Sequence, residues 1–218
     1  MEIDRYTTPL LDSNMYVISE SGHCVIIDPY FSPAAGRLLD GLKPDFMLVT
    51  HEHYDHISGV NGYKAQYGLP LYASQACSGG LADPVRNRAK FFGVWLEALG
   101  ISGQEIDPAY TCHADKIVED GQTLPWMGHR IAVKAAPGHS AGSILIFWDE
   151  SIMFSGDCLL RESIPAARFP GSDLKAFQKY TFPYLRQLEA NLMVFPGHYG
   201  CFRLGDHHLL RDMDQKSI

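Results

Sequence analysis

The sequence lacks the features that would assign it to a membrane or to an exported protein. No apolar run reaches the roughly 20 residues that a membrane-spanning helix needs. Residues 1–5 include acidic side chains, and no apolar core segment follows them, unlike in an export signal. We therefore expect a cytoplasmic protein without a membrane partner.

An excess of positive charge is also missing. The chain has 18 Lys and Arg residues against 25 Asp and Glu residues, and its formal net charge is −7. Nucleic-acid-binding domains carry clusters of positive charge, and this composition does not show that electrostatic footprint. We expect a small-molecule substrate and no nucleic-acid partner.

The cysteines do not form a disulfide framework. There are five, an odd number, and none is paired at the C-x-x-C spacing of redox and metal motifs. Free, reduced thiols are the simplest interpretation, in keeping with a cytoplasmic location.

Length and hydrophobic content fit one domain over residues 1–218. Of these residues 46% are hydrophobic, which is enough to bury a substantial core. Strands are expected at residues 14–18, 24–28, 46–49, 69–73, 131–133, 143–148, 151–154 and 192–195. The first two are expected to pair as a hairpin joined through Ser21-Gly22. Helices are expected at residues 33–41, at 57–67 with an end at Gly68, and at 173–189 with a kink at Pro183. This pattern indicates a mixed α/β fold.

A histidine-rich loop, called the metal loop below, directly follows the strand-like segment 46–49. It places His51, His53, Asp55 and His56 within six residues. Imidazole nitrogens suit zinc, iron and related divalent ions, and a carboxylate adds compensating charge. A solvated polar loop is the alternative, but metal binding explains the composition better.

Three further ligand-type residues each follow an apolar, strand-like segment. They stand in the motifs Pro137-Gly138-His139, Ser155-Gly156-Asp157 and Pro196-Gly197-His198. Several strand ends therefore carry the same kind of chemistry.

The order H-x-H-x-D-H, then His, Asp and His, resembles the metallo-β-lactamase-fold superfamily over nearly the whole chain. The resemblance implies an αβ/βα sandwich and two divalent metal ions, with zinc favoured over iron or manganese. It also implies how seven ligands are divided. One ion would be held by His51, His53 and His139, the other by Asp55, His56 and His198, with Asp157 bridging both.

Asp28 has two interpretations. It follows a buried strand and precedes Pro29, where an Asp can turn or cap the chain. The resemblance implies instead that Asp28 supports the metal loop and orients a ligand imidazole. We favour the second interpretation.

Residues 74–116 are expected to form a helical insert. Asp83-Pro84 resembles an N-cap followed by proline at the first helical position. Residues 85, 89, 92, 96 and 99 then form an apolar stripe that predicts packing on the body of the protein. The alternative is a lid over the metals, in which Phe91 and Trp95 contact an acyl group and basic residues, Arg88 among them, attract an anionic substrate.

The resemblance is greatest to short glyoxalase II-like (hydroxyacylglutathione hydrolase-like) members. These relatives carry a G-R-x-D-F-P-x-G-D segment, which Arg168-Phe169-Pro170 matches in part, so Arg168 is a candidate substrate contact. Only twenty residues follow His198, whereas longer glyoxalase II enzymes have a further helical domain that binds glutathione. Glutathione thioesters are therefore not the default substrate.

The implied ligand set predicts a metal-dependent hydrolase. A metal-bound hydroxide, oriented by Asp55, would attack an activated acyl group. The motifs offer no separate general acid, which favours leaving groups that depart as anions. A thioester is the first choice of substrate and another ester or a lactone the second. The alternative activity is that of a persulfide dioxygenase, with one iron held by His51, His139 and Asp157. A catalytically silent scaffold is disfavoured by the complete ligand set.

Five histidines match no ligand position in the family. They are expected at surface or hydrogen-bonded structural positions: His23, His113, His129, His207 and His208.

Overall fold

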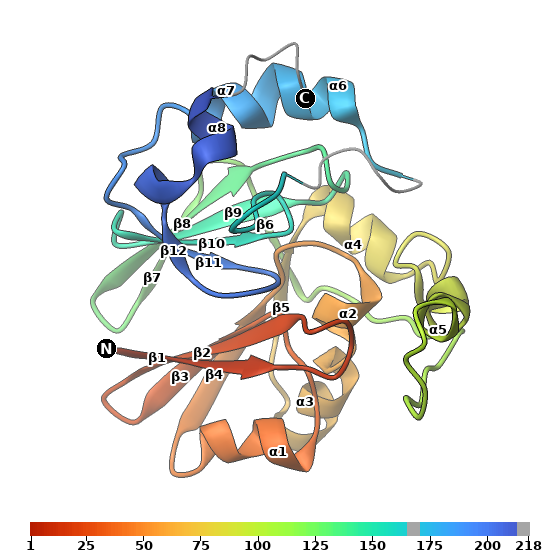
Figure 1. Cartoon of the computed structure of the whole chain (residues 1–218). Helices are drawn as coiled ribbons and strands as arrows, with labels where there is room; N and C mark the ends of the chain where they lie inside the picture. The colour runs from red at the N-terminus through yellow and green to blue at the C-terminus, as the bar shows by residue number, and fades with distance from the viewer. Residues whose placement is uncertain (165–170, 213–218) are drawn as a thin grey trace. The chain divides into compact units, whose positions relative to one another are not determined.

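The computed structural model describes residues 1–164 and 171–212. The chain divides into two compact units, Met1–Ile117 and Val118–Ile218 (Figure 1). Each unit has its own sheet and its own hydrophobic core. The single domain expected over residues 1–218 stays a prediction.

The first unit is built on a sheet in the order β1-β2-β3-β4-β5-β6. Its strands are β1 (Glu2–Thr7), β2 (Asn14–Glu20), β3 (His23–Ile27), β4 (Lys43–Leu48), β5 (Leu71–Ser74) and β6 (Lys116–Val118). The expected hairpin of β2 and β3 is confirmed, with positive φ at Ser21 (50°) and Gly22 (80°) in its turn. Positive φ at both central residues matches the twist of the paired strands.

Parallel pairing places the metal loop beside Asp28. Strands β3, β4 and β5 run parallel, and Ile27 is in register with Leu48. The carboxyl ends of parallel strands meet at one edge of a sheet. Asp28, which follows β3, and Thr50, which follows β4, are consequently neighbours.

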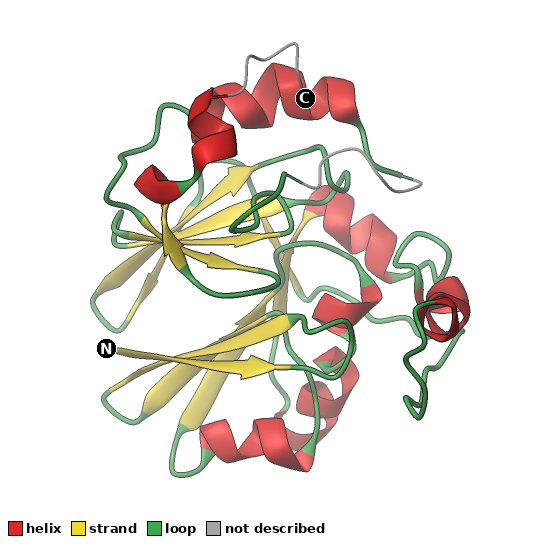
Figure 2. Cartoon of the chain, in the orientation of Figure 1, coloured by secondary structure: helices red, strands yellow, loops and turns green. Residues whose placement is uncertain are grey.

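Short helices cover one face of this sheet (Figure 2). They are α1 (Pro33–Gly36), η1 (Arg37–Leu39), α2 (Tyr54–Ile57), α3 (Val60–Tyr67), α4 (Gln75–Leu81) and α5 (Ala89–Ala98). The expected end of α3 at Gly68 is confirmed, since this glycine is left-handed at φ 67°. Helix α4 lies within the helical insert expected over residues 74–116, although its Gly79-Gly80 pair disfavours a helix. A Cβ at Gly80 would lie 2.6 Å from Cγ of Glu52, so contact with the metal loop requires a glycine there.

The predicted helix start at Asp83-Pro84 is wrong. Asp83 instead accepts a hydrogen bond from Val85 N at 2.8 Å, an Asx turn. Helix α5 begins at Ala89, whose N–H donates to the buried carboxamide of Asn87 at 2.9 Å. Arg88 between them is left-handed (φ 72°), which breaks the helix. Of the predicted apolar stripe, residues 89, 92 and 96 are buried, whereas residues 85 and 99 are 49% and 55% exposed.

The second unit is built on a sheet in the order β12-β11-β10-β9-β8-β7. Its strands are β7 (Thr123–Trp126), β8 (His129–Ala135), β9 (Ile144–Trp148), β10 (Ile152–Gly156), β11 (Met193–Pro196) and β12 (Phe202–Arg203). Strand β9 pairs antiparallel with both β8 and β10, and β10 pairs parallel with β11. Strands β8, β10 and β11 therefore point the same way, and His139, Asp157 and His198 all follow their carboxyl ends.

Helices also cover one face of this second sheet (Figure 1). They are α6 (Leu174–Ala176), η2 (Phe177–Thr181), α7 (Phe182–Leu185), η3 (Leu204–Asp206) and α8 (His208–Asp212). The helix expected over residues 173–189 is confirmed from Leu174 and ends earlier, at Leu185. Pro183 cannot donate to the preceding turn, and the segment just before it is wound as a π-helix. Among the residues that the structure describes, no helix has the length and apolar character to cross a membrane.

Candidate metal centre

The histidine-rich loop of the first unit is buried. His51, His53, Asp55 and His56 are 1%, 6%, 6% and 0% exposed. A solvated polar loop would be accessible to water, so that alternative is wrong. Buried polar groups require hydrogen-bond or metal partners.

The four donors of this loop lie close to one another. Nε2 of His51 is 3.1 Å from Nδ1 of His53, and Nε2 of His56 is 3.3 Å from Oδ2 of Asp55. The rings of His51 and His56 have centroids 4.4 Å apart. Two nitrogens held by one tetrahedral zinc at about 2.1 Å lie about 3.4 Å apart. The donor types and their separations therefore fit divalent metal ions.

Asp28 joins the backbone of this loop to one of its imidazoles. Its Oδ1 accepts from Thr50 N at 2.7 Å, and its Oδ2 accepts from Thr50 Oγ1 at 2.7 Å. Oδ2 also lies 3.1 Å from Nδ1 of His56. With Nδ1–H directed at the carboxylate, the lone pair of the His56 ring is on Nε2, the atom that faces Asp55. These are the contacts expected of a residue that orients a ligand.

Arg88 lies near these donors, although sequence analysis assigns it no specific role. Its Nε donates to Nε2 of His53 at 2.8 Å. Burial lowers the pKa of the Arg88 guanidinium, and the carboxylates of Asp55 and Glu52 oppose this shift. Sequence analysis placed Arg88 only among the basic residues of the insert, because a left-handed arginine that turns toward the metal loop has no sequence signature.

The second unit gathers its three donors around one carboxylate oxygen. Oδ2 of Asp157 lies 3.4 Å from Nε2 of His139 and 3.4 Å from Nε2 of His198. His139 and Asp157 are 2% and 9% exposed. A carboxylate between two imidazoles is an arrangement that can serve two ions, so this donor set also fits a metal centre.

Helix packing fixes the loop that carries His139. Asp173 N donates to Gly138 O at 2.7 Å, and Thr181 Oγ1 donates to Pro137 O at 2.7 Å. Gly138 has φ 150°, and a Cβ there would lie 2.6 Å from Cβ of Phe177. Only glycine lets the loop approach the helix this closely.

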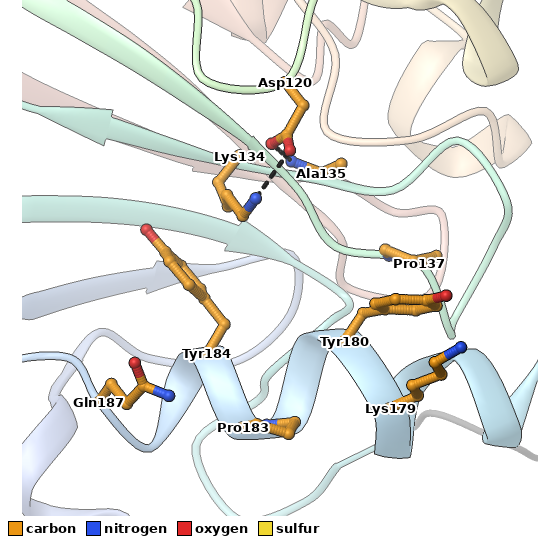
Figure 3. Close-up of a pocket in the computed structure, with 9 residues that line it drawn as sticks. All are labelled: Asp120, Lys134, Ala135, Pro137, Lys179, Tyr180, Pro183, Tyr184 and Gln187. Atoms are coloured by element: carbon orange, nitrogen blue, oxygen red, sulfur yellow. Dashed lines mark hydrogen bonds and ion pairs between the residues drawn. The ribbon is translucent and has the colours of Figure 1, made fainter.

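A groove in the second unit adjoins the same loop but contains none of the donors (Figure 3). It has a volume of about 450 Å³ and is lined by Asp120, Lys134, Ala135, Pro137, Lys179, Tyr180, Pro183, Tyr184 and Gln187. Lys134 Nζ donates to Asp120 at 2.7 Å and lies 5.5 Å from the centre of the Tyr184 ring. Its charge is therefore matched within the groove itself, and the groove is not the candidate centre.

Two of the three candidate substrate contacts, Phe91 and Trp95, lie in the insert. Phe91 on α5 is 56% exposed. Trp95 packs against the core, with its ring 5.9 Å from that of Phe92 in an edge-on arrangement. Arg168 lies outside the described residues. A substrate-binding role for these three side chains stays a prediction.

The environments of the described cysteines and of His207, a buried histidine of the second unit, fit structural roles. The five cysteines, all within the described residues, form no disulfide, and burial raises the pKa of Cys24 to about 12. His207, which is 1% exposed, lies with Nε2 2.8 Å from Leu160 O and accepts from Leu210 N at 3.0 Å. The expectation of a hydrogen-bonded structural position is confirmed for His207.

A family comparison places almost the whole chain in one group of proteins. The family model described as "Metallo-beta-lactamase superfamily" matches residues 8–198, a range that includes all seven predicted ligands. A hydroxyacylglutathione hydrolase of Serratia proteamaculans is 28% identical over 183 residues, which cover 83% of this chain. The alignment spans 59% of that enzyme's length.

Solved structures share the fold over nearly the full length. The BLEG-1 B3 metallo-beta-lactamase is 25% identical, with a TM-score of 0.77 over 95% of this chain and 96% of its own. The protein TTHA1623, solved in a di-iron-bound form, is 27% identical, with a TM-score of 0.71 over 93% of this chain and 96% of its own.

Proposed function

Because the chain belongs to the metallo-beta-lactamase superfamily and adopts its fold, as predicted, we propose that it is a dinuclear metal-dependent hydrolase of a small acyl substrate. The observation that carries the proposal is the pair of donor clusters, one in each unit, in which every donor is buried except the half-buried His198. Each contains donors spaced 3.1 to 3.4 Å apart, as ligands of a shared ion would be.

The proposed division of the ligands is the one that the family resemblance implies. His51, His53 and His139 would hold one ion. Asp55, His56 and His198 would hold the other, and Asp157 would bridge the two. The donors are nitrogen and oxygen without thiolate, a set suited to zinc, iron or manganese. We favour zinc, and the di-iron form of TTHA1623 makes iron the first alternative.

The chain's own residues would position the reacting water and orient a ligand imidazole. When bound, the two ions would supply a hydroxide nucleophile near neutral pH and polarise the acyl carbonyl. Asp55 would accept a hydrogen bond from that water and orient it toward the carbonyl carbon. Asp28 would hold His56 with its Nε2 lone pair toward the metal side, since Nδ1 faces the carboxylate of Asp28.

A thioester is the substrate class that these groups favour. The predicted ligand motifs offer proton acceptors and no separate general acid. They therefore favour a leaving group that can depart as an anion without being protonated. A thiolate meets this condition, whereas an amine must be protonated. Similarity to a hydroxyacylglutathione hydrolase supports an acylated thiol. An activated ester or a lactone ranks second.

The test compares His198→Ala with His208→Ala, because His208 is an exposed histidine of the same unit. Each purified protein is assayed against acyl thioesters, a lactone and a β-lactam. We expect the native chain and His208→Ala to hydrolyse a thioester, and His198→Ala to lose most of this activity. Full activity in His198→Ala would exclude the dinuclear mechanism. A single iron together with oxygen consumption on a persulfide would establish the dioxygenase in its place.

A further inference from the structure

A chain of hydrogen bonds links the carboxylate of Asp28 to the guanidinium of Arg88. Thr50 Oγ1 donates to Asp28 at 2.7 Å and lies 3.0 Å from Nδ1 of His51. Nε2 of His51 lies 3.1 Å from Nδ1 of His53. Nε2 of His53 accepts from Arg88 Nε at 2.8 Å. This series of hydrogen bonds runs from an anion to a cation and passes through two predicted metal ligands, His51 and His53.

The two ends of this series of hydrogen bonds determine which group donates and which accepts at each step. An ionised carboxylate only accepts and a guanidinium only donates. The hydroxyl of Thr50 donates to Asp28, so it accepts from Nδ1–H of His51, whose lone pair is then on Nε2. Arg88 donates to Nε2 of His53, so the proton of a neutral His53 ring is on Nδ1, where it points at His51.

A metal ion on His53 cannot coexist with the bond from Arg88 to the neutral ring. An ion on Nε2 would take the lone pair that Arg88 uses. An ion on Nδ1 would force the ring proton onto Nε2, where it would face the N–H of Arg88. In either case the guanidinium must leave His53.

The backbone holds Arg88 in this competing position. Arg88 is left-handed at φ 72°, a conformation that is uncommon for a non-glycine residue. The fully buried Asn87 before it donates to Leu81 O and Tyr110 O, and its own carbonyl accepts from Tyr54 N at 2.8 Å. Such a strained residue persists only where its surroundings over-determine it, which is typical of functional positions.

We propose that Arg88 is a positioning residue that competes with the metal ion for His53 and so weakens metal binding at the His51 and His53 half of the site. The inference rests on the proposed function, because it requires His53 to be a ligand. Metal loading would release the guanidinium from His53, so the position of Arg88 would report whether this half of the site is filled.

The test measures the zinc affinity of the metal-free protein by competition with a chromophoric chelator. Arg88→Ala removes the donor, and Arg88→Asn removes it while retaining a residue that tolerates the left-handed conformation. Lys90→Ala makes the same change of charge at an exposed position two residues away. We expect both Arg88 variants to bind zinc about tenfold more tightly, because one charge-assisted hydrogen bond no longer competes, and Lys90→Ala to bind as the native chain does.

Nitrogen-15 spectra of the histidine rings supply a readout that a merely structural role would not move. In the metal-free native protein the His53 proton is expected on Nδ1, and on addition of zinc Nε2 is expected to lose the signature of an acceptor from Arg88. If the native chain binds zinc and both Arg88 variants bind it with equal or weaker affinity, the proposed competition is wrong, but the proposed function is not affected. No zinc binding by the native chain would overturn the proposed function together with it.

Discussion

The carboxylate of Asp28 lies 3.1 Å from Nδ1 of His56, and the two side chains are 2% and 0% exposed. Both carboxylate oxygens also accept hydrogen bonds from Thr50, at 2.7 Å each. One acid therefore fixes the backbone of the metal loop and the ring orientation of a predicted ligand. Asp28, which follows β3, is thereby linked to the predicted ligands that follow β4.

Replacing Asp28 with Asn should weaken metal binding. The carboxamide keeps the size of the side chain, but its NH₂ group cannot accept from Thr50 or His56. Removal of such a supporting partner typically lowers metal affinity by about 10- to 100-fold. Asp45→Asn is the matched control, because Asp45 pairs with the partly exposed His23 at 2.9 Å in the same unit. Equal zinc affinity of the two variants would contradict the role of Asp28.

Replacing Gly138 with Ala should destabilise the second unit and displace His139. The new Cβ would collide with Phe177 in a backbone conformation that favours glycine, and we expect a loss of about 1–3 kcal/mol in the free energy of unfolding. Gly36→Ala is the control, since a Cβ there would meet no atom within 4 Å beyond its chain neighbours and the backbone of its own helix, α1. Urea denaturation should show Gly36→Ala to be neutral or slightly stabilising. Similar midpoints for both variants would show that the contact with Phe177 is unimportant.

His207 should make stability depend on pH. Burial lowers the pKa of His207 below its ordinary value of 6.5, and its hydrogen bonds only partly offset the shift. The unfolded chain therefore takes up a proton at a higher pH than the folded chain does. The contribution of neutral His207 is complete above 6.5 and is lost as the pH falls from there toward the folded pKa.

The corresponding measurement compares urea midpoints at about pH 7.5 and about pH 5. His207→Gln should show a smaller loss of stability on acidification than the native chain. His208→Gln, at an exposed position, should keep the native difference. An undiminished pH dependence in His207→Gln would assign it to other groups.

The residues that sequence analysis placed correctly are those whose positions follow from local rules. The turn at Ser21-Gly22 and the left-handed end of α3 at Gly68 depend on conformations that glycine favours. The donors in each unit follow strands that run in one direction, so local order in the sequence becomes proximity at a sheet edge.

The insert shows why other parts of the structure could not be predicted from the sequence. Asp83-Pro84 has the composition of a helix start, but the buried carboxamide of Asn87 supplies the acceptor for the first turn of α5 instead. That carboxamide is set by contacts with Leu81 and Tyr110, which are 6 and 23 residues away. The approach of Arg88 to His53 depends on the same packing, so no local pattern could reveal it.

The metal content of the purified chain tests the central claim most directly. After reconstitution with zinc and removal of the excess by gel filtration, elemental analysis should find two zinc ions per chain, as the proposed division of the seven ligands into two sets requires. One ion per chain, or none, would contradict the dinuclear site.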